Sequence, residues 1–365
     1  MGRSSFGSSA PKPDPHHGVR FCPDPCFGFC QQVLISRLDM LAVHHPKRYR
    51  SRYSKPHRSG QNGRIEGAPV HVMPQRILLQ TTLPTLDDDW SIWRFSLLEQ
   101  YLKTRLDAAG EPLCEVTARD RQPDDSGNDP VLSRLSRNDF DQLWLFALDV
   151  GDGLSAADMA GILHFHESGG GLLTTRDHQD MGLSMVALGL LGQFHHFHSQ
   201  NLDPDTSRCD PDDIYSSSIS FPNYHSGRNG DYQTITPTEP LHPLLKRPDG
   251  KPLQFFPAHP HEGSVAVPAQ ALEARLIATG VSLVSGRDFN LVVVGDRPTT
   301  ATSSPGRVVA QSTFHHFVDY NWDIDQGCPS FVDEPPGDGM KQNPQALADI
   351  HTYISNLVMW LAPED

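Results

Sequence analysis

The sequence lacks any hydrophobic run long enough to cross a membrane. Its 365 residues contain no stretch of about 18 consecutive apolar residues. The chain also shows no basic start followed by an apolar core and a small-residue cleavage site, as a secretory signal has. These absences predict a soluble, cytoplasmic protein that makes no contact with a membrane.

Cysteine is scarce as well. Six cysteines at irregular spacing are too few for a disulfide framework in a chain of this length. Cys22, Cys26 and Cys30 form a C-x3-C-x3-C row. Their spacing differs from the C-x2-C pairs of common zinc sites and from the patterns of iron–sulfur clusters. The row therefore favours an ordinary segment over a metal site.

Basic residues are few outside the start of the chain. Met1 to Arg76 holds 12 Lys and Arg against 4 Asp and Glu, and the remainder holds 18 against 40, a net charge of −22. Such an acidic body repels phosphates, so it excludes a nucleic-acid surface and favours a small-molecule substrate. Nothing in the pattern indicates an oligomeric state.

Composition divides the chain into a tail and a body. Residues 1–72 are rich in Ser, Pro, Gly and Arg and can form little core, so they predict a disordered basic tail. Residues 73–365 alternate strands with helices, which predicts an α/β domain with a flavodoxin-like, open, mostly parallel sheet and helices on both faces. An Asp-, Pro- and Ser-rich stretch at about 193–250 predicts an inserted loop region.

The expected elements follow from hydrophobic runs and capping signals. Strands are predicted at 76–83, 113–120, 140–149, 169–175, 253–258, 274–280, 290–296 and 306–313. Helices are predicted at 87–110, at 155–168 behind a capping box, at 181–191 and from 343 onward.

Polar and acidic loops follow these strands, and three of the loops place histidine beside a carboxylate. In an open α/β sheet, ligands bind beyond the carboxyl ends of the strands, so these loops predict one cleft. The candidate catalytic residues are Asp177, His178, His259, Glu262 and His315. The candidate substrate-binding residues are Arg176, Asp180, His261, His316, Asp319 and Trp322.

Two kinds of site remain open for this cleft. A divalent metal would suit His259, His261 and His178, because a His-x-His pair in an extended segment points both rings to one face. A sugar-binding cleft would use the same polar groups together with an aromatic platform such as Trp90 or Tyr320.

Three motifs resemble the class I glutamine amidotransferase-like superfamily and, within it, the ThuA-like (trehalose-utilisation) branch. The stretch GGGLLTTRDHQ at 169–179 resembles the strand and nucleophile elbow of that superfamily. GRVVAQSTFHHF at 306–317 resembles a late strand that ends before a histidine, and LHPLL at 241–245 resembles the "HP" motif. The resemblance covers about residues 76–363 and implies a flavodoxin-like fold.

The chain departs from this pattern at the nucleophile. Amidotransferases carry Cys at the elbow, where this chain has Thr175. A threonine hydroxyl is a poor nucleophile without strong activation, so glutamine hydrolysis is not expected. We expect an enzyme that acts on a small polar, carbohydrate-related substrate at the His/Asp-rich cleft, with a divalent metal as the candidate cofactor. The alternative is a non-catalytic ligand-binding or scaffold protein with a degenerate amidotransferase-like fold.

Overall fold

The computed structural model describes residues 73–107, 109–208, 219–271, 273–297 and 305–364. The predicted tail, residues 1–72, lies outside the described residues. Contacts divide the chain into two units, Met1–Ile65 and Glu66–Asp365, and every described residue belongs to the second.

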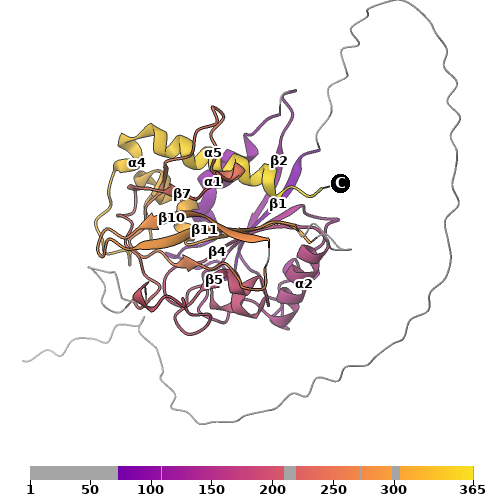
Figure 1. Cartoon of the computed structure of the whole chain (residues 1–365). Helices are drawn as coiled ribbons and strands as arrows, with labels where there is room; N and C mark the ends of the chain where they lie inside the picture. Colours follow the sequence, from indigo (N-terminus) through magenta and orange to yellow (C-terminus); the bar gives the residue numbers. More distant parts are fainter. Residues whose placement is uncertain (1–72, 108, 209–218, 272, 298–304, 365) are drawn as a thin grey trace, which may run out of the picture. The chain divides into compact units, whose positions relative to one another are not determined.

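An eight-stranded sheet forms the centre of the domain, in the order β2-β1-β3-β4-β12-β11-β10-β7 (Figure 1). The first five strands of that order run parallel to one another. They are β2 (Cys114–Arg119), β1 (Gln75–Thr81), β3 (Gln142–Phe146), β4 (Gly171–Thr175) and β12 (Val308–Gln311). The predicted α/β class and mostly parallel, flavodoxin-like sheet are confirmed.

The remaining strands of this sheet pair antiparallel. β11 (Asp288–Gly295) runs against β12, β10 (Ala274–Val281) runs against β11, and β7 (Thr236–Pro237) runs against β10. The reversal places the loop after β11 at the opposite edge from the loops after the parallel strands. The prediction that this loop reaches the cleft was therefore wrong, because strand direction depends on long-range pairing.

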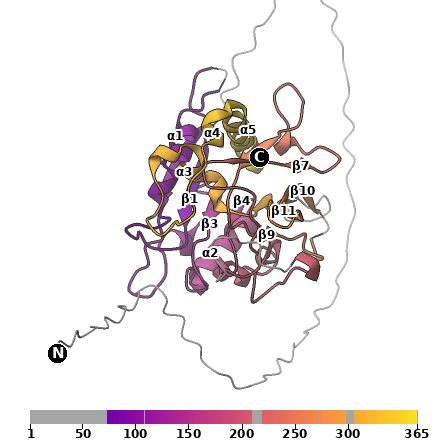
Figure 2. The same cartoon turned by 90° about the vertical axis from the view of Figure 1, so that its left-hand side faces the viewer.

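Helices cover both faces of the sheet, as predicted. α1 (Ser96–Lys103) and α5 (Pro344–Leu361) lie on one face, and α2 (Ala156–Glu167) lies on the other (Figure 2). Each face has its own cluster of buried side chains. The sheet is therefore buried on both sides, which explains the almost continuous apolar runs of its parallel strands.

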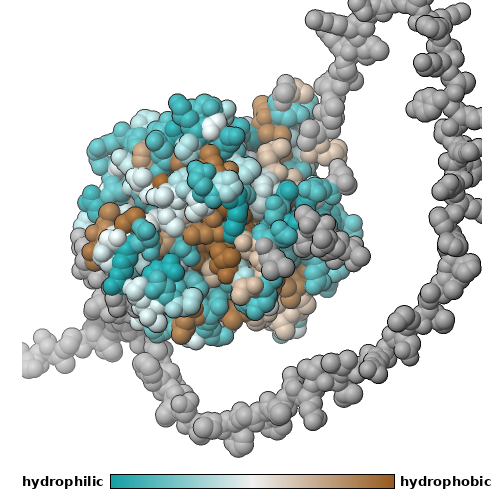
Figure 3. All heavy atoms as spheres, in the orientation of Figure 1, coloured by the Kyte–Doolittle hydropathy of each residue, from teal (hydrophilic) through white to brown (hydrophobic). Residues whose placement is uncertain are grey.

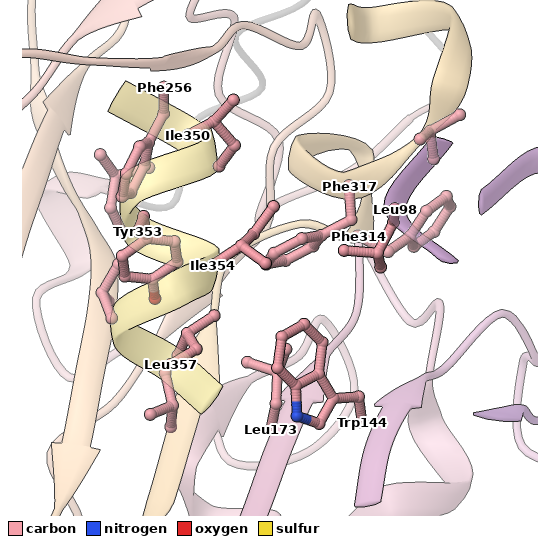
Figure 4. Close-up of a cluster of buried hydrophobic side chains, with 14 of the residues drawn as sticks. Leu98, Trp144, Leu173, Phe256, Phe314, Phe317, Ile350, Tyr353, Ile354 and Leu357 are labelled. Carbon is pink, nitrogen blue, oxygen red and sulfur yellow. The ribbon is translucent and has the colours of Figure 1, made fainter. Parts of the chain in front are cut away.

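Helix α5 packs through the apolar stripe that its sequence predicts. Ala346, Ile350, Ile354, Leu357 and Leu361 are buried at spacings of three and four residues. Figure 4 shows its side chains packed together with aromatic rings from other elements. Each fully buried aliphatic side chain contributes about 1.5 to 3 kcal/mol, so this stripe fixes the helix on the sheet.

The predicted start of one helix is confirmed, whereas another expected helix does not form. Ser155 and Asp158 make the predicted capping box at the start of α2. The stretch 181–191, predicted as a helix, instead forms a short 3-10 turn over Leu183–Ala187. Gly182 and Gly189 have φ values of +83° and +59°, which an α-helix cannot contain.

The inserted region contributes two small antiparallel pairs. β5 (His195–His196) pairs with β9 (Ser264–Val265), and β6 (Tyr232–Thr234) pairs with β8 (Phe255–Pro257). The short helices after β12 are α3 (Asp319–Trp322) and α4 (Gly339–Gln342). The 3-10 turns not yet named are Ile92–Phe95, Leu132–Arg134, Gly192–Phe194, Thr206–Arg208, Pro243–Leu245, Phe314–Phe317 and Ile324–Gln326.

The surface is mainly polar. Figure 3 shows hydrophilic side chains over most of one face, with smaller hydrophobic patches between them. In the described part of the chain, no helix combines the length and the apolar character needed to span a bilayer.

Candidate functional site

A pocket of about 420 Å³ is formed by loops at the carboxyl ends of the parallel strands. The loop after β4 and the segment after β12 meet there with the loop after β8, a strand that lies outside the main sheet. The lining residues are Leu83, Asp89, Trp90, Leu148, Asp177, His178, Met181, Ile219, Asn229, His259, Pro260, His261, His315, Phe331, Val332, Asp333 and Glu334. Five predicted site residues therefore converge on one pocket.

The carboxylate of Asp177 is the centre of the polar part of this pocket. Its Oδ2 lies 2.8 Å from His178 Nδ1, 3.4 Å from His259 Nε2 and 3.6 Å from His315 Nε2. Its Oδ1 accepts a hydrogen bond of 2.7 Å from the hydroxyl of Thr313. One buried carboxylate is thus faced by three imidazoles from three separate segments.

The surroundings of Asp177 keep it ionised. Burial alone would raise its pKa, but the facing imidazoles of His259, His315 and His178 outweigh burial and hold the pKa of Asp177 well below its usual range. The side chain is almost completely buried. A negative charge therefore lies on an almost completely buried side chain that lines the pocket.

His259 is held in a defined orientation. Its Nδ1 lies 2.8 Å from Asn229 Oδ1, and its ring stacks on that of His315 with centroids 3.5 Å apart and an interplanar angle of 10°. Burial, followed by the neighbouring His315, lowers the pKa of His259 to about 3. The Nδ1–H group donates to the Asn229 oxygen, so Nε2 is the ring nitrogen that faces Asp177.

A glycine allows the three segments to approach so closely. A β-carbon at Gly263 would lie 2.5 Å from the Asp177 carbonyl oxygen and 2.7 Å from the Ser312 carbonyl oxygen. Any larger residue would push the loop after β8 away from the ends of β4 and β12. Gly263 thus brings His259 to within contact distance of Asp177.

His178, His261 and Trp90 form the wall around this centre. The ring of His261 lies 5.6 Å from that of His178 and 5.7 Å from that of His259, between centroids. Trp90 meets the ring of His315 edge-on at 4.5 Å. The His178 side chain is 20% exposed, more than the other histidines that contact Asp177. Among the three imidazoles that contact Asp177, it is therefore the best placed to reach a bound molecule.

Two predicted site residues are absent from the pocket lining and belong to a buried network behind it. Glu262 accepts hydrogen bonds from Ser226, Gln233 and Ser312. His316 Nε2 lies 3.4 Å from Glu262, and both side chains are completely buried. Because Ser226 Oγ also accepts from the backbone N–H of His259 at 3.0 Å, this network supports the loop that carries His259.

The other candidate substrate-binding residues, apart from His261, form hydrogen bonds that stabilise the fold. The guanidinium of Arg176 donates to backbone carbonyls, and Asp180 accepts from the N–H of Ser199 at 3.0 Å. Asp319 accepts from the backbone N–H groups of Ser96 and Leu97 at the start of α1. The indole of Trp322 donates to the His316 carbonyl at 2.9 Å. Of these predicted residues, only His261 lines the pocket.

Sequence reasoning missed three residues that shape the site. Asn229 orients His259, Thr313 orients Asp177, and Glu334 adds a second buried carboxylate to the pocket. Glu334 Oε1 lies 3.0 Å from His225 Nε2. Thr313 lies two residues after the end of β12 and could have been found by the same rule as His315. Asn229 and Glu334 lie in irregular segments with no comparable signal.

Comparison with known proteins gives similar folds but no similar sequence. No protein-family model matches the chain, and neither does any curated protein. A solved protein from Bacteroides uniformis, described as ThuA-like, shares 11% identity at a TM-score of 0.37, over 79% of this chain and 95% of that one. A second solved protein, from Parabacteroides merdae and also described as ThuA-like, shares 16% identity at a TM-score of 0.39, over 73% of this chain and 96% of that one.

A further solved structure, the N-terminal domain of mmIFT52, shares 8% identity at a TM-score of 0.40, over 77% of this chain and 97% of that one. At such identities the likenesses concern the fold and assign neither activity nor substrate. The fold class itself follows from the strand order and directions of this chain.

In the sequence resemblance described above, Thr175 stands where amidotransferases carry their thiol. Thr175 is the last residue of β4 and is completely buried. Its hydroxyl donates to the Leu145 carbonyl at 3.4 Å and does not line the pocket. The residues that do line the pocket are the imidazoles and carboxylates described above, so they carry any chemistry that occurs there.

Proposed function

We propose that the protein is an enzyme that acts on a small polar, carbohydrate-related substrate in this pocket. His178 transfers a proton to or from a substrate hydroxyl, and Asp177 orients His178 for that task. The observation that carries the proposal is the 2.8 Å contact between His178 Nδ1 and Asp177 Oδ2 at the pocket surface. A carboxylate on Nδ1 leaves Nε2 as the nitrogen that can exchange a proton with a ligand.

The size and lining of the pocket support a small ligand. Its volume of about 420 Å³ lies within the usual range for small-molecule sites, roughly 300 to 1,000 Å³. Trp90 and Phe331 supply aromatic surface, while Asp89, Asp333 and Glu334 supply acceptors for hydroxyl groups. A ring with several hydroxyls matches such a mixture of flat apolar surface and carboxylates.

Two polar atoms of the pocket could accept hydrogen bonds from a ligand. Within the described part of the chain, His259 Nε2 and Glu334 Oε2 are buried without a hydrogen-bond partner. Leaving such a group unpaired costs about 1 to 3 kcal/mol, and hydroxyl groups of a bound ligand would remove that cost.

The test is a substrate screen with two histidine variants. The full chain is incubated with small polyhydroxylated compounds, including trehalose and other disaccharides, monosaccharides and sugar acids, and products are followed by NMR. We expect His178→Gln to lower turnover of the active compound by about 100-fold or more, the usual contribution of a general acid or base. Binding of that compound, measured by calorimetry, should change little. His164→Gln, on the exposed side of α2, is the matched control.

Two outcomes would contradict the proposal. Unchanged turnover in His178→Gln would remove His178 from the chemistry. Absence of both binding and turnover across the whole panel would favour the scaffold alternative.

A further inference from the structure

The Nε2 atom of His259 faces a buried carboxylate. His259 Nδ1 donates a hydrogen bond to Asn229 Oδ1 at 2.8 Å, and Nε2 lies 3.4 Å from Asp177 Oδ2. Within the described residues, this Nε2 is buried and forms no hydrogen bond. An imidazole nitrogen and a carboxylate oxygen are both common metal ligands. A cation bound to both atoms would give the buried Nε2 a partner.

His315 adds a third donor to the same point. One ligand atom from each of Asp177, His259 and His315 lies within 4.8 Å of the other two, and all three residues are buried. The distances from Asp177 Oδ2 to the two Nε2 atoms are 3.4 and 3.6 Å. In a tetrahedral zinc site with bonds of about 2.0 to 2.2 Å, neighbouring ligand atoms lie about 3.3 to 3.5 Å apart.

We infer that Asp177, His259 and His315 form a mononuclear site for a divalent transition-metal ion, with an open coordination position toward the pocket. Two imidazoles and one carboxylate suit Zn²⁺ or a similar ion, whereas Mg²⁺ and Ca²⁺ prefer oxygen ligands alone. All three ligands line the pocket, so an ion held by them would face a bound substrate. This set differs from the sequence-based candidates, which combined His259 with His261 and His178.

The residues around the ligands match those that usually support a metal. A ligating histidine commonly donates its other ring N–H to an oxygen acceptor, as His259 does to Asn229. Thr313 fixes the Asp177 carboxylate through Oδ1, which leaves Oδ2 toward the histidines. These supporting bonds orient the donor atoms of His259 and Asp177 before any ion arrives. The role of the ion in catalysis rests on the proposed function, whereas its binding does not.

The test measures metal binding directly on the full chain. Protein stripped with a chelator is titrated with Zn²⁺ by calorimetry and with Co²⁺ by visible absorption. We expect one ion to bind per chain through these residues, with Co²⁺ showing the d–d bands of nitrogen and oxygen ligands. Thiolate-to-cobalt charge-transfer bands would instead mark a site at cysteine residues.

Variants assign the site to these residues. His315→Ala should abolish this saturable binding, whereas His164→Ala should bind as the wild type does. Asn229→Ala keeps all three ligands and should weaken binding by about 10- to 100-fold, the usual effect of removing the acceptor behind a ligating histidine. It provides a second readout if His315→Ala does not fold, as judged by circular dichroism.

The inference is overturned if the stripped wild type binds neither ion, if thiolate bands alone appear, or if the ion binds equally well to both site variants. The proposed function does not fail with this inference. Turnover that depends on His178 in metal-free protein would still support acid–base chemistry at the pocket.

Discussion

Replacing the buried Arg176 should destabilise the protein strongly, although Arg176 forms no ion pair with a carboxylate in the described structure. Its Nε donates to the Met181 carbonyl at 3.0 Å and its Nη1 to the His196 carbonyl at 2.7 Å, while Nη2 donates to the Gln179 carbonyl. The guanidinium also stacks on Phe197, with 4.4 Å to the ring centroid. Burial lowers the pKa of Arg176 to about 9, so the side chain remains charged at pH 7.

The magnitude follows from the acceptors that would lose this donor in Arg176→Met. The Gln179 carbonyl would keep one hydrogen bond, because it also accepts from the N–H of His198. The carbonyls of Met181 and His196 would lose the hydrogen bond from Arg176. A buried acceptor left unpaired costs about 1 to 3 kcal/mol, which gives about 2 to 6 kcal/mol for two. Part of this loss in the free energy of unfolding is offset in the variant, because a neutral methionine does not have to be desolvated as a charged arginine does. We expect the free energy of unfolding to fall by about 3 kcal/mol.

Urea unfolding followed by tryptophan fluorescence measures this loss, provided that the slope with denaturant stays unchanged. Arg228→Met is the matched control, because Arg228 is exposed and its guanidinium pairs with Asp231 at 3.2 Å. That variant should change the free energy of unfolding by less than about 0.5 kcal/mol. A loss below about 1 kcal/mol in Arg176→Met would refute the reasoning, since the loop carrying Asp177 would then not depend on this arginine.

Three further predictions concern residues away from the pocket. Burial lowers the pKa of His242 to about 4, so its contribution to stability is complete above pH 6.5 and is lost as pH falls toward 4. His242→Asn, which can still cap the turn at Leu244, should therefore lose less thermal stability than the wild type between pH 7 and pH 5; equal losses would contradict this. Gly171→Ala should lower the free energy of unfolding by more than about 1 kcal/mol in urea titration, because its β-carbon would lie 2.2 Å from the Leu361 carbonyl oxygen; a neutral effect would show that β4 and α5 can separate freely. Burial raises the pKa of Cys114 to about 11, so iodoacetamide at pH 8 should label it only in urea, and mass-spectrometric detection of labelling in the folded protein would count against the structure.

Patterns within one segment were enough to predict much of this fold. The apolar stripe of α5, the capping box at Ser155 and the buried runs of the parallel strands each depend on neighbours in the sequence. The position of the site loop at Asp177 and His178 could also be predicted. Loops that follow parallel strands meet at one edge of the sheet, so only the strand assignments were needed. His315 was found in the same way.

Only the tertiary structure decided which polar side chains face the pocket. Asp177 and Arg176 are adjacent, yet one lines the cavity and the other turns into the protein toward backbone carbonyls. Likewise, His315 lines the pocket, whereas His316 lies beside the buried Glu262. Successive residues in that tight turn point to different sides.

Long-range pairing decided the rest. The reversed direction of β11 removed one expected loop from the site edge, and the approach permitted by Gly263 brought His259 to Asp177. Asn229 and Glu334 reach the pocket from irregular segments whose paths depend on packing against the rest of the domain. The sequence by itself thus determined the parallel strands, the helices that cover them and the edge at which polar groups gather. The choice of ligating and lining atoms was left to contacts between residues far apart in the chain, which no periodic pattern encodes.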